Sequence, residues 1–435
     1  MWAEEAVLYQ IYPLGLCGAP FENDGKQEHR ILKILEFIPH IKKLGVDTIL
    51  FNPLFESDTH GYNTRDYRRC DVRLGTNEDL KKVINALHEN RFRVIFDGVF
   101  NHAGRGFFGF QDVQKNRESS PYRDWFYLRF DGDSAYGDGF WYEGWEGNYD
   151  LVKLNLDNPV VCDYLMESVK FWIDEFDLDG LRLDVAYMVN QNFLKRLRYE
   201  TSQWKDDFYL IGEILGGDYR RIMNNEMCHS ATNYECYKGI YSALNSDNLF
   251  EIVHSLLRQF GKDPWCLYTG MHPLSFVDNH DVTRIASILT DERKLPLAYA
   301  VMFAMPGIPC LYYGSEWGVK GEKSQGDPAL RPAFSGPEWT SLCDYIAALA
   351  KARHHAGALA YGDFTSLVLE NKHCLFERRF GEERILAAVN IEENPHVFHA
   401  DYQAGRAKDL ITGKTVDFGG GLEVPGFTAY ILQPC

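Results

Sequence analysis

Short apolar segments alternate with amphipathic segments along most of the chain. The segment AVLYQIYP at 6–13 is apolar, rich in aromatic residues and closed by a proline, which favours a buried strand over a helix. A helix is predicted over about 29–44, where a glycine ends it, and VDTILFNP follows as a second strand. The letters TNED have the spacing of a capping box that opens the next helix, and RVIFDGVFNH at 93–102 is predicted as the third strand.

The same alternation continues through five further strands. Pro159 follows Asn158 at a predicted first helical position, and an apolar stripe at helical spacing leads to GLRLDVAY at 180–187. The remaining four strands are predicted at 208–213, 229–234, 274–280 and 308–316. Eight strands with intervening helices predict an α/β fold, a closed (β/α)8 TIM barrel.

Two segments interrupt the alternation. Residues 103–156 are rich in Gly, Asp and aromatic residues and are too long for a simple connection, so they predict a small lobe inserted after the third strand. Beyond His355, short alternating runs separated by turn signals predict a C-terminal all-β sandwich domain. The predicted organisation is a barrel of residues 1–102 and 157–355, an inserted lobe of residues 103–156 and a β-domain of residues 356–435.

Composition excludes several classes of protein. A chain of 435 residues with 14% aromatic residues can bury a large core, which argues against disorder. A formal charge of −17 without any run of Lys or Arg argues against nucleic acid or a membrane surface as partner. The start MWAEE lacks the basic residues of an export signal, so a cytoplasmic protein is expected. Ten cysteines without C-x-x-C spacing are expected to be reduced thiols.

The strand GLRLD contains two charges among apolar residues. Arg182 and Asp184 are two residues apart, so in a strand both point to the same face. Catalytic side chains of such barrels stand at the C-terminal ends of the strands. Carboxylates are predicted at four of these ends, Asp97, Asp184, Glu213 and Asp278.

Each of these residues, taken singly, has a structural explanation. Asp97 would cap a turn, Arg182 would neutralise Asp184, and His102 and His280 would be core histidines with satisfied hydrogen bonds. Taken together they are hard to explain by stability, because four acids at one end of a barrel repel one another. The constellation therefore predicts a catalytic site.

Four segments resemble a known family. DGVFNH, GLRLD, the glutamate of LIGE and FVDNHD are similar, in this order, to the conserved segments of the α-amylase superfamily of glycoside hydrolases. VDTILFNPLFES, HGYNTRDY and GIPCLYYGSE resemble further segments of that family, so the resemblance covers nearly the whole chain. The inserted lobe and the terminal β-domain also fall where that family has its B and C domains.

The resemblance implies a role for each acid. Asp184 would be the nucleophile of a covalent glycosyl-enzyme, Glu213 the general acid and then base, and Asp278 the acid that binds sugar hydroxyls. Two such carboxylates imply retention of configuration. Tyr62 would stack on the sugar at the cleavage point. The full set of substrate-binding residues that the resemblance implies around the acids is His60, Tyr62, Asp97, His102, Arg182 and His280.

Residues of the inserted lobe, and of the segment that ends it, narrow the range of expected substrates. Trp141, Tyr142 and Trp145 are candidate stacking platforms, with packing of the lobe core as the alternative for each. Lys153 and Asn155 in DLVKLNLDNP resemble the signature of neopullulanases and cyclomaltodextrinases, and VAYM replaces the Lys-His pair of many amylases. The expected substrates are therefore maltooligosaccharides, cyclodextrins or related α-glucans, cleaved at α-1,4 and, as a second linkage, α-1,6 bonds.

Cofactor and assembly are less determined. Many family members bind a structural calcium ion through the asparagine that matches Asn101, and no other cofactor is expected. Neopullulanases and cyclomaltodextrinases dimerise through an N-terminal β-module, whereas this chain starts almost at its first barrel strand. A monomer and a homodimer both remain open.

Other functions compete with this interpretation. A metal-holding barrel enzyme of the enolase type would also place acids at strand ends, but Arg182 beside Asp184 would repel the metal. A sugar-binding relative without activity would not need all the acids. Within the family, a transglycosylase, a disaccharide isomerase and a polymer-cutting α-amylase remain open, because water and a second sugar compete for the same intermediate.

Overall fold

Eight parallel strands form a closed barrel at the centre of the molecule. The computed structural model describes residues 1–435. In chain order the strands are β1 (Leu8–Ile11), β2 (Thr48–Phe51), β5 (Arg93–Gly98), β11 (Gly180–Leu183), β12 (Tyr209–Gly212), β13 (Ser230–Ala231), β14 (Leu274–Ser275) and β15 (Ile308–Tyr312). Their order in the sheet is β13-β12-β11-β5-β2-β1-β15-β14, and a parallel bridge between Thr232 and Leu274 closes the ring. The predicted TIM barrel, with all eight of its strands, is confirmed.

Helices surround the barrel, and two of them begin as the sequence predicts. The main ones are α3 (Ile34–Lys43), α4 (Asn77–Glu89), α6 (Pro159–Phe176), α7 (Gln191–Trp204), α8 (Tyr234–Ser246), α9 (Phe250–Phe260), α11 (Leu295–Ala304) and α13 (Ser341–His355). At α4 the Thr76 hydroxyl accepts from the Asp79 amide, and the Asp79 carboxylate accepts in return from the Thr76 amide. At α6 the Asn158 side chain caps the helix and Pro159 occupies its first turn.

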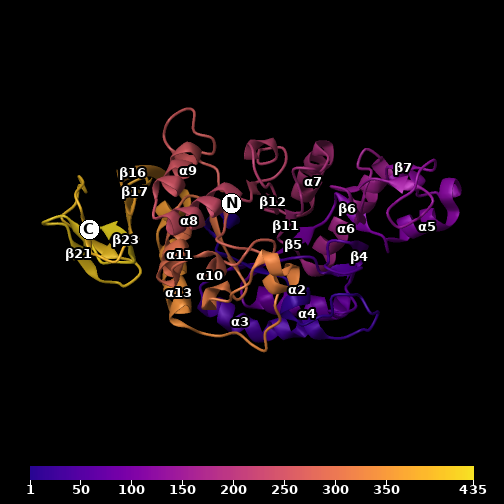
Figure 1. The fold of residues 1–435 in the computed structure, drawn as a ribbon, viewed down its shortest axis with the longest axis horizontal. Coiled ribbons are helices and arrows are strands. Elements are labelled where there is room, and N and C mark those ends of the chain that lie inside the picture. The colour runs from indigo at the N-terminus through magenta and orange to yellow at the C-terminus, as the bar shows by residue number, and fades with distance from the viewer.

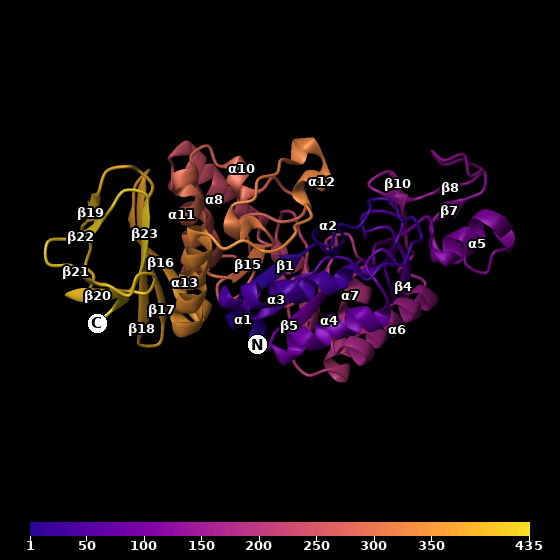
Figure 2. The same cartoon turned by 90° about the horizontal axis from the view of Figure 1, so that it is seen from below.

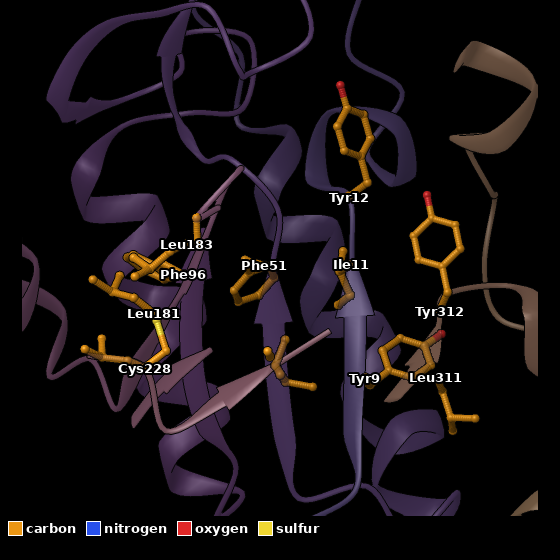
Figure 3. Close-up of a cluster of buried hydrophobic side chains, with 14 of the residues drawn as sticks. Tyr9, Ile11, Tyr12, Phe51, Phe96, Leu181, Leu183, Cys228, Leu311 and Tyr312 are labelled. Carbon is orange, nitrogen blue, oxygen red and sulfur yellow. The ribbon is translucent and has the colours of Figure 1, made fainter. Parts of the chain in front are cut away.

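The strands divide the core into two layers. Alternate residues of neighbouring strands form a small cluster that includes Leu8, Leu50, Ile95, Ile211 and Ile308. The intervening residues belong to a much larger cluster that also contains the apolar faces of the helices. Figure 3 shows part of this outer layer, with Tyr9 and Ile11 from β1, Phe51 from β2, Phe96 from β5 and Leu181 and Leu183 from β11. Residues two apart thus point either into the barrel or toward the helices.

The inserted lobe and the C-terminal domain lie at opposite ends of the molecule (Figures 1 and 2). The lobe contains a three-stranded sheet of β6 (His102–Gly104), β10 (Asn148–Lys153) and β9 (Gly144–Trp145). It also contains α5 (Phe108–Asn116) and the strand pair β7 (Leu128–Arg129) and β8 (Trp141–Tyr142). The predicted insertion after the third strand is confirmed.

The C-terminal domain is the predicted antiparallel β-structure. Six strands form one sheet: β16 (Asp363–Leu369), β17 (His373–Phe380), β18 (Glu383–Asn390), β23 (Thr428–Pro434), β20 (Arg406–Asp409) and β21 (Thr415–Asp417). A second sheet pairs β19 (His396–Phe398) with β22 (Leu422–Val424). Leu375 and Leu386 of the first sheet pack with Phe398 and Leu422 of the second, which makes the core of a sandwich.

None of the helices has both the length and the apolar character needed to cross a membrane. All ten cysteines are free, and eight of them are buried.

Candidate active site

At the C-terminal ends of the barrel strands, the residues that point into the barrel are polar. Gln10 follows Leu8, Asn52 follows Leu50, and Asp97 follows Ile95, each at the two-residue spacing of its strand. Arg182 in β11 belongs to this row, and Asp184 and Glu213 complete it directly after β11 and β12. Asp184 and Glu213 reach a cleft of about 430 Å³, whose lining also includes His60, Tyr62, His102, Trp145 and Asp281. Gln10, Asn52, Asp97 and Arg182 are buried and are not part of this lining.

One guanidinium joins three carboxylates at these strand ends. Arg182 is 4% exposed, and its Nη1 donates to both oxygens of Asp97 at 2.9 Å and to Oδ1 of Asp184 at 3.0 Å. Its Nη2 lies 2.8 Å from Oε1 of Glu213. The backbone amide of Val185 donates to the other oxygen of Glu213 at 2.8 Å. A single positive charge thus faces three acids, and the excess negative charge stays in the cleft.

The pKa values of the acids in the cleft shift in different directions, although burial raises each of them. It raises the pKa of Glu213 and of Asp184, and Arg182 opposes this in both cases. Burial alone would also raise the pKa of Asp281, but His280 and Arg331 hold it well below its ordinary value. Asp281 thus stays ionised beside two acids whose protonated forms are favoured by burial.

Asp278 does not reach the cleft, which corrects the prediction for the third acid. Its side chain is buried, and its carboxylate accepts from the Ser315 hydroxyl at 2.8 Å and from the Ile285 amide at 2.8 Å. Asp281, the second aspartate of FVDNHD, lines the cleft instead. The parallel ladder of β14 ends at Ser275. The two-residue alternation that would point Asp278 inward therefore no longer applies three residues later.

His280 is held beneath the cleft by two amides. Gln10 Nε2 lies 2.9 Å from His280 Nδ1 and donates to Asn52 Oδ1 at 2.9 Å. An amide nitrogen is only a donor, so His280 Nδ1 accepts and its hydrogen sits on Nε2. That Nε2 lies 2.9 Å from Oδ2 of Asp281, and the Tyr62 hydroxyl is also beside it. The tautomer lets His280 donate to the acid in the cleft.

His102 presents a free donor to the cleft. Its Nδ1 lies 3.3 Å from the amide nitrogen of Asn101, which again leaves the hydrogen on Nε2. This Nε2 is buried without a hydrogen-bond partner and lies 3.9 Å from Oδ2 of Asp184. Burial lowers the pKa of His102 to about 3 and that of His60 to about 4, so both rings are neutral at pH 7. A buried donor without a partner fits a ligand hydroxyl.

The residue after Asp184 has a strained backbone. Val185 has a φ of 39°, a conformation that a β-branched residue rarely adopts. Its amide is the one that donates to Glu213. The strained peptide therefore positions the carboxylate of Glu213 beside Asp184.

Of the predicted aromatic platforms of the lobe, only Trp145 reaches the cleft, whereas Asn148 and Leu151 of the lobe line it without having been predicted. Trp145 lines the cleft, and its Nε1 donates to Met188 Sδ at 3.2 Å. Trp141 packs instead against the guanidinium of Arg129, and Tyr142 is fully buried in the lobe. Trp141 is therefore not brought to the cleft.

Lys153 and Asn101 also lie outside the lining of the cleft. The ammonium group of Lys153 pairs with Oε1 of Glu143 at 2.5 Å. Asn101 is buried, and its backbone carbonyl accepts from the Leu154 amide, so it joins the lobe to the barrel. The one group of three His, Cys, Asp or Glu residues close enough to hold an ion lies in the C-terminal domain, far along the chain from Asn101. A calcium ion at Asn101 stays a prediction.

Besides Asp281, three charged residues of the cleft were not predicted. Lys323, Asp327 and Arg331 belong to the segment after β15 and form a chain of ion pairs. Arg331 ends this chain 2.9 Å from Oδ1 of Asp281. These residues are four apart, a spacing that is typical of a helix, and α12 (Asp327–Leu330) does form there. The pattern of strands and helices predicts no element in this segment, so its charged residues were not considered.

Comparisons with known proteins agree with this geometry. Residues 21–355 match the family model of the α-amylase catalytic domain. The chain belongs to the α-amylase family. A cyclomaltodextrinase of a Bacillus species is 30% identical over 91% of this chain and 74% of its own length.

Two further proteins extend the comparison of this α-amylase family member. An intracellular maltogenic amylase of Bacillus subtilis is 34% identical over 68% of this chain and half of its own length. The crystal structure of a Nostoc punctiforme debranching enzyme soaked with acarbose superposes with a TM-score of 0.83 and 27% identity. That superposition covers 99% of this chain and 98% of the debranching enzyme.

Proposed function

We propose that the protein is a retaining hydrolase of α-1,4-glucosidic bonds in maltooligosaccharides, cyclodextrins or related short α-glucans. The observation that supports it is the meeting of Asp184, Glu213 and Asp281 in one cleft, with Arg182 against the first two. Family membership makes the protein a glycoside hydrolase that acts on α-glucans.

The first step breaks the glycosidic bond. Oδ2 of Asp184, which Arg182 leaves free, attacks the anomeric carbon, while Glu213 transfers its proton to the departing oxygen. Burial raises the pKa of Glu213, which favours the protonated form that a general acid needs. Arg182 then compensates the carboxylate that Glu213 becomes.

Positive charge develops on the sugar ring during this step. Asp281 is ionised because of His280 and Arg331, and it can accept hydrogen bonds from sugar hydroxyls as that charge grows. His102 Nε2 donates to a hydroxyl on the other side, beside Asp184. Tyr62, 8% exposed, offers its ring as the stacking surface.

The second step releases the sugar. Glu213, now a base, takes a proton from water, and the water oxygen displaces Asp184 from the anomeric carbon. Two inversions give the α-anomer. An NMR spectrum early in the reaction should show it, and an early β-anomer would contradict Asp184 as nucleophile.

Substrate size and linkage follow from the cleft and from the relatives. A cleft of about 430 Å³ holds a few sugar units rather than a long polymer. The cyclomaltodextrinase relative supports short or cyclic α-1,4-glucans, and the debranching enzyme makes α-1,6 bonds the second linkage to test.

Parallel kinetics decide the substrate class. We expect kcat/KM per cleavable chain to be higher for maltotriose to maltohexaose and for β-cyclodextrin than for soluble starch. Pullulan tests the α-1,6 linkage in the same assay. Starch as the preferred substrate would favour a polymer-cutting α-amylase, and products longer than the substrate would favour a transglycosylase.

We further propose a cytoplasmic location, in which the enzyme meets oligosaccharides already cut by other enzymes. The intracellular maltogenic amylase of Bacillus subtilis supports this. The acidic surface does not favour nucleic acid or anionic membranes as partners. Whether the protein is a monomer or a homodimer is tested by light scattering.

A further inference from the structure

Two histidines and a glutamate meet in the C-terminal domain, away from the cleft. Glu370 precedes β17, His373 begins β17, and His396 begins β19. One possible ligand atom from each lies within 4.8 Å of the other two. We propose that these three side chains bind a transition-metal ion, with zinc as the expected metal.

The distances are close to those of a coordination shell. His373 Nδ1 lies 2.9 Å and His396 Nε2 lies 3.8 Å from the same oxygen, Oε2 of Glu370. Ligands about 2.1 Å from a tetrahedral zinc ion are about 3.4 Å apart. Each contact is therefore within about half an ångström of the separation that zinc requires.

The hydrogen bonds of His373 supply an independent argument for a cation. Its Nδ1 faces Glu370 and its Nε2 faces Oε1 of Glu392, both at 2.9 Å. A neutral imidazole has one hydrogen, so one of the two contacts would place a nitrogen lone pair against a carboxylate oxygen unless a second proton or another cation lies there. A metal ion at Nδ1 removes this repulsion, while the hydrogen on Nε2 is donated to Glu392.

The same arrangement is typical of metal-bound histidine. A ligating imidazole usually donates its other N–H to a carboxylate, which fixes the tautomer and the ring orientation. Glu392 stands in that position, and Lys372 lies 3.7 Å from its second oxygen. Two imidazoles and one carboxylate suit zinc, copper or nickel, whereas calcium and magnesium prefer oxygen ligands alone.

One ring has to turn for the ion to bind. The rings of His373 and His396 are stacked with centroids 3.6 Å apart and planes 12° from parallel, so their lone pairs do not yet converge. The side chain of His396 makes no hydrogen bond and is 22% exposed, so its rotation gives up only the ring contacts with His373 and Phe398. The side chain of Glu370 is 52% exposed, so it can move to meet the ion after the His396 ring has turned.

The proposed metal site lies where the two sheets of the C-terminal domain meet, close to a contact with the barrel. His373 is in the six-stranded sheet and His396 in the two-stranded sheet, so a shared ion would join the two sheets. The turn between Glu370 and His373 also contacts the barrel, where the Asn371 carbonyl accepts from the Leu249 amide at 2.7 Å. A bound ion would therefore brace the sandwich and its contact with the barrel.

Metal binding by the purified untagged chain tests the proposal. The protein is first treated with a chelator, and Cys435, the exposed free thiol, is replaced by serine in every variant to remove a competing ligand. Zn²⁺ is titrated by competition with a chromophoric chelator, and Co²⁺ absorption reports the coordination geometry. We expect one Zn²⁺ per chain and a tetrahedral Co²⁺ spectrum.

The variants separate ligands from neighbours. His396→Ala should abolish the tight Zn²⁺ site, and Glu392→Gln should weaken it by about 10–100-fold, because it removes only the partner of the second nitrogen. His399→Ala is the matched control, since His399 is exposed, lies three residues from His396 and is outside the cluster. It should leave the affinity unchanged.

Two results would overturn the proposal. One is equal Zn²⁺ affinity in the parent protein and in the His396→Ala variant. The other is an imidazole NMR spectrum in which His373 is protonated on both nitrogens at pH 7 with Zn²⁺ in excess, because a proton would then fill the place assigned to the ion. Neither readout depends on glycosidase activity.

Discussion

Two fully enclosed arginines in this protein have opposite surroundings. Arg73 uses all five of its N–H groups, on Asp71, on the Ser57 hydroxyl and on two backbone carbonyls. Arg182 faces three carboxylates at 2.8–3.0 Å. The first pair is balanced in charge and in hydrogen bonds, and the second group is not.

The comparison separates support from chemistry. Around Arg73 one positive charge meets one negative charge, and removal of either would leave an unpaired buried ion. Around Arg182 the negative charges outnumber the positive one, so the group costs stability unless a proton or a substrate compensates. The catalytic site is therefore distinguished by buried charges that do not balance, and not by the presence of a buried charge alone.

The largest expected effect is on the chemistry at Arg182. Asp184→Asn and Glu213→Gln should each lower kcat on maltotriose by a factor on the order of 10³ or more, with the fold intact. A substrate with a good leaving group should rescue the glycosylation step of Glu213→Gln but not that of Asp184→Asn. Equal rescue of both would refute this division of roles.

Asp71→Asn is the control variant at Arg73, where the charges are balanced. It leaves Arg73 buried and unpaired, so it should lower the free energy of unfolding by about 3–5 kcal/mol in a urea titration. The kcat of the molecules that remain folded should be nearly unchanged. If Asp71→Asn lowered kcat and spared stability, the contrast between the two arginines would be lost.

The second prediction separates two aspartates of one motif. Asp281→Asn should lower kcat by a factor on the order of 10², because it removes a charge that faces the developing positive charge on the sugar. Asp278→Asn should change kcat less than threefold and cost about 2 kcal/mol of stability, since its carboxylate serves Ser315 and Ile285. The opposite pattern in the two assays would restore Asp278 as the third acid.

The error over Asp278 shows how far sequence alone can predict. The barrel, the inserted lobe and the β-domain follow from periodicity and segment length, and capping at Thr76 and Asn158 follows from local hydrogen bonding. The position of Asp184 and Glu213 in the site could be predicted because each directly follows a regular, paired strand. Asp278 could not, because it lies beyond the last paired residue of β14, where backbone direction is set by tertiary contacts.

The lobe was harder still to predict. Its aromatic residues share one composition, yet Trp145 lines the cleft, Trp141 packs on Arg129, and Tyr142 is buried. No period distinguishes such neighbours in strands of two residues. The ion-paired segment of Lys323 and Asp327 was missed for the same reason, since its position over the cleft depends on packing.

A third, smaller effect is expected beneath the cleft, at Gln10. Gln10→Met removes the donor that fixes the tautomer of His280 and should lower kcat/KM about tenfold, the effect of one hydrogen bond of about 1.4 kcal/mol. Gln10→Glu puts an acceptor there, so His280 should hold protons on both nitrogens and the pH profile of kcat should move. Imidazole NMR checks the tautomer. A flat loss of activity with an unchanged pH profile would assign Gln10 a packing role only.

The smallest effect expected is a change in thermal stability with pH, of opposite sign for two acids of one cleft. Burial raises the pKa of Glu213 above its ordinary 4.5, so its contribution to stability is present below pH 4.5 and is lost as pH rises through the raised value. Glu213→Gln should therefore raise Tm by a few degrees at pH 8, with the gain vanishing near pH 4.

For Asp281 the sign reverses. Despite its burial, His280 and Arg331 depress the pKa of Asp281, so it stabilises the fold above its ordinary value of 3.8 and loses this as pH falls below that value. Asp281→Asn should therefore lower Tm at pH 7. Scanning calorimetry of both variants between pH 4 and pH 8 checks the pair. Shifts of the same sign at pH 8 would mean that the surplus charge around Arg182 is already neutralised in the free enzyme, and the contrast with Arg73 would then be one of hydrogen bonds alone.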